Sequence, residues 1–230
     1  MFSKRQSSQI DLLYYLLSFF YKDYFYVSVY KRILSMDNRI LNENDTYYLY
    51  RTLSLVLGLF HDKDIEYWAN GGTLLGAVRC GGIILWDDDV DIAIPASQES
   101  KLLALKDSSS MKMRRIFLKK PSNKYYKILH EDNKDVWIDI CIIEEDGTDR
   151  RGHKIKRRYL EDEIYPLRHV QFSSVRCPMY IPNKAEEYLD RVFPNWRTEI
   201  IMYSHKDNKK NKIKKVLTDE LNVALPYHYK

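Results

Sequence analysis

The stretch DDDVDIAI, residues 87–94, decides the fold of this 230-residue chain. Polar and apolar residues alternate from Asp89 to Ile92, and the run then becomes wholly apolar and ends at Pro95. Alternation with a period of two predicts a β-strand, and the apolar end predicts that this strand enters a core. On such a strand Asp89 and Asp91 point to one face, roughly 6–7 Å apart.

Two carboxylates at this spacing can hold one or two divalent cations between them. Paired cations of this kind clamp the attacking and the leaving oxygen of a phosphoryl transfer. Oxygen ligands without a nearby His or Cys favour Mg²⁺ or Mn²⁺ over zinc. A calcium loop of the EF-hand type does not fit, because the apolar run 92–94 and Pro95 do not supply its Gly and Glu.

A third acid stands in the most hydrophobic strand candidate, VWIDICII, residues 136–143, with Asp139 near its middle. Burying a carboxylate without compensation is costly. A metal ion would remove that cost, as would a paired Arg or Lys, and a place at an exposed strand edge would avoid it. Because a two-acid strand lies upstream, we expect Asp139 to complete a metal site with Asp89 and Asp91.

A glycine-rich stretch, GGTLLGAVR at residues 71–79, lies between a short strand candidate and a short helix. The backbone N–H groups of Gly71, Gly72 and Thr73 can bind phosphate oxygens, and glycine lets a ligand come close. Arg79 could hold a phosphate by a bidentate contact. Two glycines alone are weak evidence, but here an arginine and a two-acid strand follow within about 20 residues.

The remaining patterns predict the surrounding elements. Polar residues 42–45 are suited to cap a helix over 46–60, where apolar residues recur at helical spacing. The other expected helices are 97–105, 153–163 and 184–191, and the other expected strands are 65–69, 114–118, 124–130 and an extended or hairpin segment over 168–181. We expect one domain over 44–197, with a helical extension over 1–43 and a basic segment over 198–230.

Composition places the chain among globular proteins, with 45% hydrophobic residues and a net charge of +5. The basic run 205–215 is interpreted as a solvated segment or as a site for a polyanion. No aromatic residues interleave with its lysines, so a nucleic-acid partner is not expected. Cys80, Cys141 and Cys177 fit neither a disulfide framework nor a zinc ribbon, which favours a reducing, cytoplasmic location.

The N-terminal residues 10–21 are mostly apolar, after two basic residues. About a dozen apolar residues is too few to span a bilayer, which needs roughly 20. No small-residue cleavage site follows. We therefore expect a packed helix, and peripheral contact with a membrane through residues 10–30 stays an alternative.

Two long runs resemble a known family. GGTLLGAVR (71–79) and GIILWDDDVDI (82–92) are similar to the LicD/fukutin signature GTLLGAVR…GFIPWDDDIDI. Weaker similarities, which together extend the resemblance to about residues 46–197, are WIDI (137–140), YPLRHV (165–170), IPN (181–183) and AEEYL (185–189). The resemblance implies an α+β nucleotidyltransferase-like fold, in which a small mixed β-sheet is flanked by helices.

The resemblance also implies a reaction: transfer of a phosphorylated alcohol, such as phosphocholine or ribitol phosphate, from a CDP-linked donor to a glycan hydroxyl, with release of CMP. The implied metal ligands are Asp89, Asp91 and Asp139, with Asp87 as a further catalytic candidate. The implied donor-binding residues are Gly71, Gly72, Thr73, Arg79, Trp86 and Asn183. We expect Asp88 to point away from the others and to be structural.

Some residues depart from the family pattern, namely Cys80, Leu85 and the run FPNW at 193–196. None is an implied ligand, so we expect changed pocket geometry rather than lost chemistry. Two other functions stay open: a nucleotidyltransferase that moves a nucleoside monophosphate from a triphosphate, and a non-catalytic nucleotide-binding module of the same fold.

Overall fold

The computed structural model describes residues 41–84, 87–122, 125–152, 157–173, 175, 178–202 and 214–217. Trp86 and nearly all of the expected N-terminal extension lie outside the described residues. The elements in chain order are α2 (Glu43–Asp62), β1 (Trp68–Ala69), α3 (Gly71–Arg79), β2 (Asp89–Pro95), η1 (Ala96–Gln98), α4 (Glu99–Ala104), α5 (Ser109–Met113), β3 (Ile116–Ser122), β4 (Tyr125–His130), β5 (Trp137–Ile143), β6 (Arg168–Val170), β7 (Met179–Ile181), α6 (Ala185–Val192), β8 (Glu199–Met202) and β9 (Lys214–Leu217).

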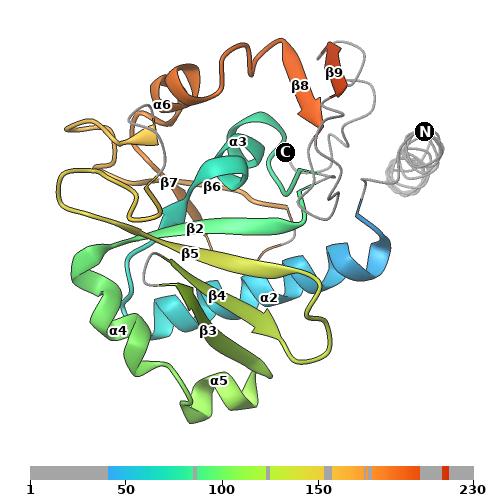
Figure 1. Cartoon of the computed structure of the whole chain (residues 1–230), viewed down its shortest axis with the longest axis vertical. Helices are drawn as coiled ribbons and strands as arrows, with labels where there is room; N and C mark the ends of the chain where they lie inside the picture. Colours follow the sequence, from blue (N-terminus) through green and yellow to red (C-terminus); the bar gives the residue numbers. More distant parts are fainter. Residues whose placement is uncertain are drawn as a thin grey trace, which may run out of the picture.

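A five-stranded sheet in the order β1-β2-β5-β4-β3 forms the centre of the fold (Figure 1). Its two middle neighbours, β2 and β5, run parallel, and the other pairs are antiparallel, so the sheet is mixed. Successive side chains on a strand point to opposite faces. One face of β2 and β5 is therefore fully buried and apolar, through Val90, Ile92, Ile94, Ile138, Ile140 and Ile142.

Helix α2 covers this apolar face, where it contacts β2, β4 and β5. Its apolar positions Leu49, Leu53, Val56 and Phe60 are fully buried, as their helical spacing predicts. The helix begins after Asn42, whose side-chain oxygen accepts a hydrogen bond of 2.8 Å from the backbone N–H of Asp45. The expected polar cap is thus confirmed.

Helix α3 packs next to β2 and contacts β1, β7 and α6 (Figure 1). Strand β1 pairs with β2, and the chain turns at Asn70 directly into α3. The backbone N–H of Asn70 donates to the carbonyl of Asp91 at 3.0 Å. This short connection brings the start of α3 beside the acidic residues of β2.

The expected α+β class and small mixed sheet are confirmed, and β6 pairs antiparallel with β7, as the hairpin alternative for 168–181 predicts. The helix expected over 153–163 is wrong for its described part, because residues 157–163 form no α-helix and end in a turn at 161–163. The backbone N–H of Tyr159 donates to the carbonyl of Gly147 at 3.0 Å, a long-range bond that replaces a helical one. Among the described residues, no helix is both long enough and apolar enough to cross a membrane.

Candidate active site

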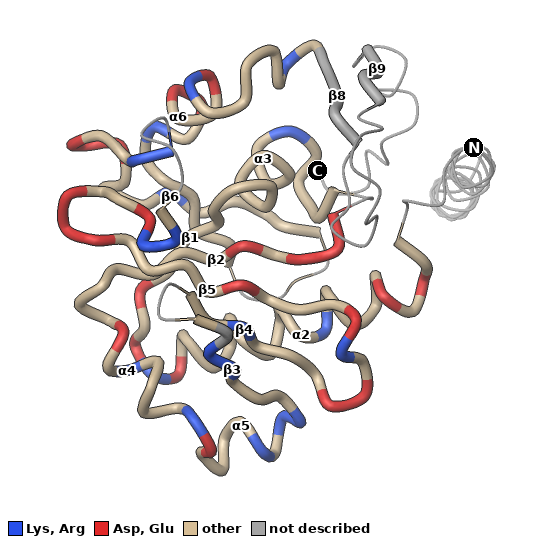
Figure 2. Tube along the Cα trace, viewed as in Figure 1, with Lys and Arg blue, Asp and Glu red and all other residues tan. Residues whose placement is uncertain are grey.

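A row of four charged side chains crosses the sheet on the face opposite α2. Strand register pairs Asp91 with Asp139, Asp139 with Lys127, and Lys127 with Lys119. Paired residues on neighbouring strands share a face and lie about 5 Å apart. Figure 2 shows the acids on β2 and β5 beside the bases on β4 and β3. Asp89, two residues before Asp91, lies on the same face as expected.

The glycines that begin α3 lie against two of the carboxylates. A methyl group built on Gly71 would come within 3.0 Å of Asp91 Oδ2, and one on Gly72 would come as close to Asp87 Oδ2. Gly71 also has a φ of +51°, which L-residues rarely adopt. We expected these glycines to admit a ligand, whereas the groups that approach them here are the protein's own carboxylates. The positive end of the helix dipole favours those negative charges.

The acids at the start of β2 form a tighter group than the sequence indicates. Carboxylate oxygens of Asp87, Asp88 and Asp89 lie within 4.8 Å of one another. The expectation that Asp88 points away is therefore wrong, and the reason is that β2 begins only at Asp89, so strand alternation does not govern the residues before it. Burial, followed by the charges of Asp89, Asp91 and Asp88, raises the pKa of Asp87 well above its ordinary value.

Asp139 is nearly buried in the middle of the sheet. Its Oδ1 atom makes no hydrogen bond of normal geometry to the described residues, and the nearest cation, Lys127 Nζ, is 3.6 Å away. Burial and then the charge of Asp91 raise the pKa of Asp139 to about 6, while Lys127, Arg151 and the indole of Trp137 act in the opposite direction. Because β5 is central, the exposed-edge alternative is excluded, and pairing with a lysine is observed.

The donor set fits a hard divalent cation. Asp87, Asp89, Asp91 and Asp139 offer only oxygen atoms, which Mg²⁺ and Mn²⁺ prefer. The buried Oδ1 of Asp139 without a hydrogen bond and the raised pKa of Asp87 both indicate more negative charge than the neighbouring bases neutralise. A cation among these acids would offset that cost.

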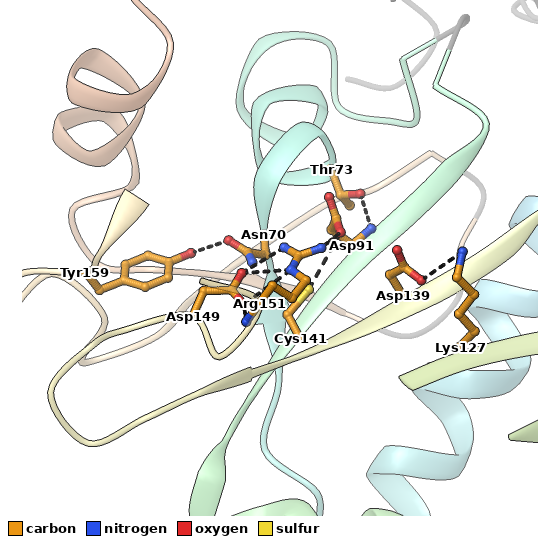
Figure 3. A network of polar contacts seen from close by, with 9 residues as sticks. All are labelled: Asn70, Thr73, Asp91, Lys127, Asp139, Cys141, Asp149, Arg151 and Tyr159. Carbon is orange, nitrogen blue, oxygen red and sulfur yellow. Dashed lines mark hydrogen bonds and ion pairs between the residues drawn. The ribbon is translucent and has the colours of Figure 1, made fainter. Parts of the chain in front are cut away.

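Arg151 enters the site from the segment after β5, and the sequence analysis did not identify it. Its Nη1 donates to Asp91 Oδ1 at 2.7 Å, and its Nε donates to Asp149 Oδ2 at 2.9 Å. Figure 3 shows Arg151 between the two carboxylates. Two arginines stand side by side at positions 150 and 151, and nothing in their sequence context distinguishes them.

The residues expected to bind a donor are not all brought together. Thr73 lies at the site, where its hydroxyl oxygen accepts a 2.8 Å hydrogen bond from the backbone N–H of Asp91. Arg79 stands at the other end of α3, about 10 Å from Gly72 at 1.5 Å per helical residue. Its Nη1 donates to the carbonyl of Trp196 at 3.4 Å, and burial lowers its pKa. Asn183 donates its backbone N–H to the carbonyl of Ile164 at 2.9 Å.

Comparison with known proteins identifies the family. The model of the LicD/FKTN/FKRP nucleotidyltransferase domain matches residues 64–184, just over half of the chain. An uncharacterized Rickettsia typhi protein is 31% identical over 193 residues, which are 79% of this chain and 59% of that protein. An uncharacterized Rickettsia prowazekii protein is 29% identical over 75% of this chain and 66% of its own length. The chain thus spans less than two thirds of these relatives.

A named relative is the ribitol 5-phosphate transferase FKRP of Mus musculus, 30% identical over 63% of this chain and 31% of that protein. Among solved structures, the lincosamide adenylyltransferase LnuA covers 83% of this chain and 99% of its own, with 16% identity and a TM-score of 0.38. At this TM-score the superposition does not by itself establish the fold. The family model carries the assignment, and it includes both the glycine stretch and all the carboxylates of the row. The chain therefore belongs to the LicD/FKTN/FKRP family and carries its nucleotidyltransferase domain.

Proposed function

We propose that the chain is a metal-dependent transferase that moves a phosphorylated alcohol from a CDP-linked donor to a glycan hydroxyl and releases CMP. The observation that carries the proposal is the approach of Asp91 and Asp87 to the glycine start of α3. Asp89 lies in one group with Asp87, and Asp139 is the neighbour of Asp91 in the sheet. The name of the mouse relative supports ribitol phosphate as one candidate for the transferred group. Phosphocholine is a second candidate, because the family resemblance includes both.

The proposal assigns Asp89, Asp91 and Asp139 to hold Mg²⁺ or Mn²⁺. Such an ion neutralises charge on the phosphate oxygens and lowers the pKa of a bound hydroxyl. The protein's own groups do the rest. Asp139 or Asp87 accepts the proton of the acceptor hydroxyl, as a carboxylate within hydrogen-bonding reach of it can.

Donor binding is assigned to the start of α3. The backbone N–H groups of Gly71 and Gly72 begin a helix, and such groups stabilise negative phosphoryl oxygens as their charge develops. The hydrogen bond between Thr73 and Asp91 joins β2 to this helix, so the carboxylates of β2 and the backbone N–H groups of α3 keep a fixed position relative to each other. Arg79 serves a part of the donor distant from the transferred phosphoryl group, and Trp86 and Asn183 stay proposed donor residues.

The test uses the purified chain with Mg²⁺, an acceptor glycan pool and a panel of CDP-linked alcohols, with released CMP as the measured product. Asp89→Asn and Asp91→Asn should abolish CMP release, because each removes a ligand charge without changing size. Asp107→Asn is the matched control, since Asp107 is exposed and its φ of +60° suits asparagine. Full activity in both ligand variants would refute the assignment.

The same assay separates the rival functions. Release of pyrophosphate from a nucleoside triphosphate would replace the proposal with nucleotidyl transfer. A calorimetric titration that shows no binding of Mg²⁺ or of any CDP-linked donor would favour a non-catalytic module. We also propose a cytoplasmic location, and cysteine usage is the support for it.

A further inference from the structure

The segment after β5 folds back on the end of that strand and presents two neighbouring arginines to opposite sides. Asp149 forms an antiparallel bridge with Ile143, and the backbone N–H of Arg150 donates to the carbonyl of Ile142 at 2.9 Å. Arg150 binds Glu99 and Glu144 with a half-buried side chain. Arg151 points inward, so the fold places its guanidinium beside the carboxylate row.

Arg151 is held on both sides by carboxylates. Asp149 is buried and contacts Arg151 through Nε at 2.9 Å, through Nη2 at 2.9 Å and through the backbone N–H at 2.9 Å. These contacts fix the orientation of the guanidinium plane, and so fix the position of the Nη1 atom that binds Asp91. The charges of Arg151 and Asp149 cancel, so the pair adds little net charge to the site.

The two oxygens of Asp91 have different surroundings. Oδ1 accepts from Arg151 Nη1 at 2.7 Å, and the Cys141 thiol lies 3.6 Å from the same oxygen. Oδ2 lies on the other side, next to Gly71 at the start of α3. Arg151 therefore holds one oxygen of Asp91, and the other oxygen lies against the glycine that begins α3.

We propose that Arg151, held by Asp149, is a positioning residue that binds Oδ1 of Asp91 and so presents Oδ2 as a single-oxygen ligand for the divalent cation. The inference rests on the proposed function, because Asp91 is a metal ligand only there. A single oxygen in a fixed direction suits Mg²⁺, which requires near-octahedral geometry. Ca²⁺ accepts two oxygens of one carboxylate and a looser shell. Arg151 thus selects the smaller ion as well as orienting the ligand.

The experiment measures Mg²⁺ and Ca²⁺ binding to the full chain by calorimetry, with thermal unfolding as the check on folding. The main variant is the double change Arg151→Gln with Asp149→Asn, which removes both charges of the pair together and so leaves the net charge of the site unchanged. Groups that orient a metal ligand typically change metal affinity 10–100-fold. We expect the double variant to lose Mg²⁺ affinity by roughly that factor and Ca²⁺ affinity by much less.

Two further variants complete the test. Arg151→Lys keeps the charge but cannot reproduce the planar fork, so it should give a smaller loss in the same direction, and it decides the question if the double variant does not fold. Arg150→Gln, the matched control on the neighbouring arginine, should leave both affinities unchanged.

Equal losses for both ions, or no loss for either, would show that Arg151 and Asp149 only stabilise the fold, and the inference would be overturned. Absence of saturable Mg²⁺ binding in the unmodified chain would overturn the proposed metal site, and the inference with it. The two failures are therefore distinguishable by the behaviour of the unmodified protein.

Discussion

Replacing Asp139 by asparagine should stabilise the metal-free protein at neutral and higher pH. The side chain is nearly buried, and its pKa is raised from an ordinary 3.8 to about 6, first by burial and then by Asp91. The folded state therefore holds the ionised carboxylate less favourably than the unfolded state does. Asparagine has almost the same shape and no charge to bury.

The magnitude follows from the pKa difference. One pKa unit corresponds to about 1.4 kcal/mol, so a shift of about two units costs roughly 3 kcal/mol when Asp139 is fully ionised. That pKa already includes the attraction of Lys127. The buried asparagine amide leaves part of its hydrogen-bonding capacity unused, which costs about 1 kcal/mol. We therefore expect a net gain of about 2 kcal/mol, or roughly 4–8 °C in the unfolding midpoint.

The difference in unfolding free energy between the variant and the wild type depends on pH between about 4 and 6. Below about pH 4 Asp139 is protonated in both states and the two proteins should be equally stable with respect to this group. As pH rises from about 4 to 6, Asp139 is ionised in the unfolded chain but still largely protonated in the folded protein. The wild type therefore loses stability relative to the variant over this range. Above pH 6 the difference should be constant.

The assay is urea unfolding in EDTA at intervals from pH 4 to pH 8, with Asp107→Asn as the exposed control. A variant that is no more stable than the wild type at pH 8 would refute the electrostatic account of this site. A gain that does not change between pH 4 and pH 7 would do so equally, because titration of Asp139 would then play no part.

Three further outcomes are expected. Adding Mg²⁺ should raise the unfolding midpoint of the wild type in a concentration-dependent way and leave Asp91→Asn unaffected, as a thermal shift titration would show. Gly72→Ala should lower CMP release at least tenfold with little change in unfolding, because the new methyl displaces only the Asp87 carboxylate. Gly76→Ala should instead lower stability by roughly 1–3 kcal/mol, because its methyl meets a backbone carbonyl. Glu163→Gln should cost roughly 2 kcal/mol in urea unfolding and leave transfer activity intact, because it breaks the ion pair between buried Glu163 and half-buried Arg191, neither of which is assigned to the site.

Local sequence patterns were sufficient for the main elements of the fold. The apolar spacing of α2, the alternation of β2 and the apolar run of β5 each predict their element, and all three are observed. The placement of Asp89 and Asp91 on one face follows from strand geometry alone, since the side-chain period is two. The family resemblance came from the same contiguous residues, because a signature of this kind is local by nature.

Other features could not be predicted from the sequence, because they depend on contacts between distant segments. Residues 157–163 form no α-helix because Tyr159 is bound to distant segments. Its backbone N–H donates to the carbonyl of Gly147, and its hydroxyl donates to Asn70. A pattern within one segment does not reveal either partner. Asp88 joins the acidic group because β2 begins only at Asp89, so strand alternation does not govern the residue before it.

The sequence by itself thus determined the strands of the central sheet, the helix that covers its apolar face and the carboxylates on the opposite face, since these follow from the repeat of side chains along one segment. Only the tertiary structure decided that Asp139 stands beside Asp91 with Lys127, that the glycines make room for the protein's own acids, and that Arg151 rather than Arg150 reaches the site. These facts arise from strand register and from the path of a connecting segment, which short-range pattern does not encode.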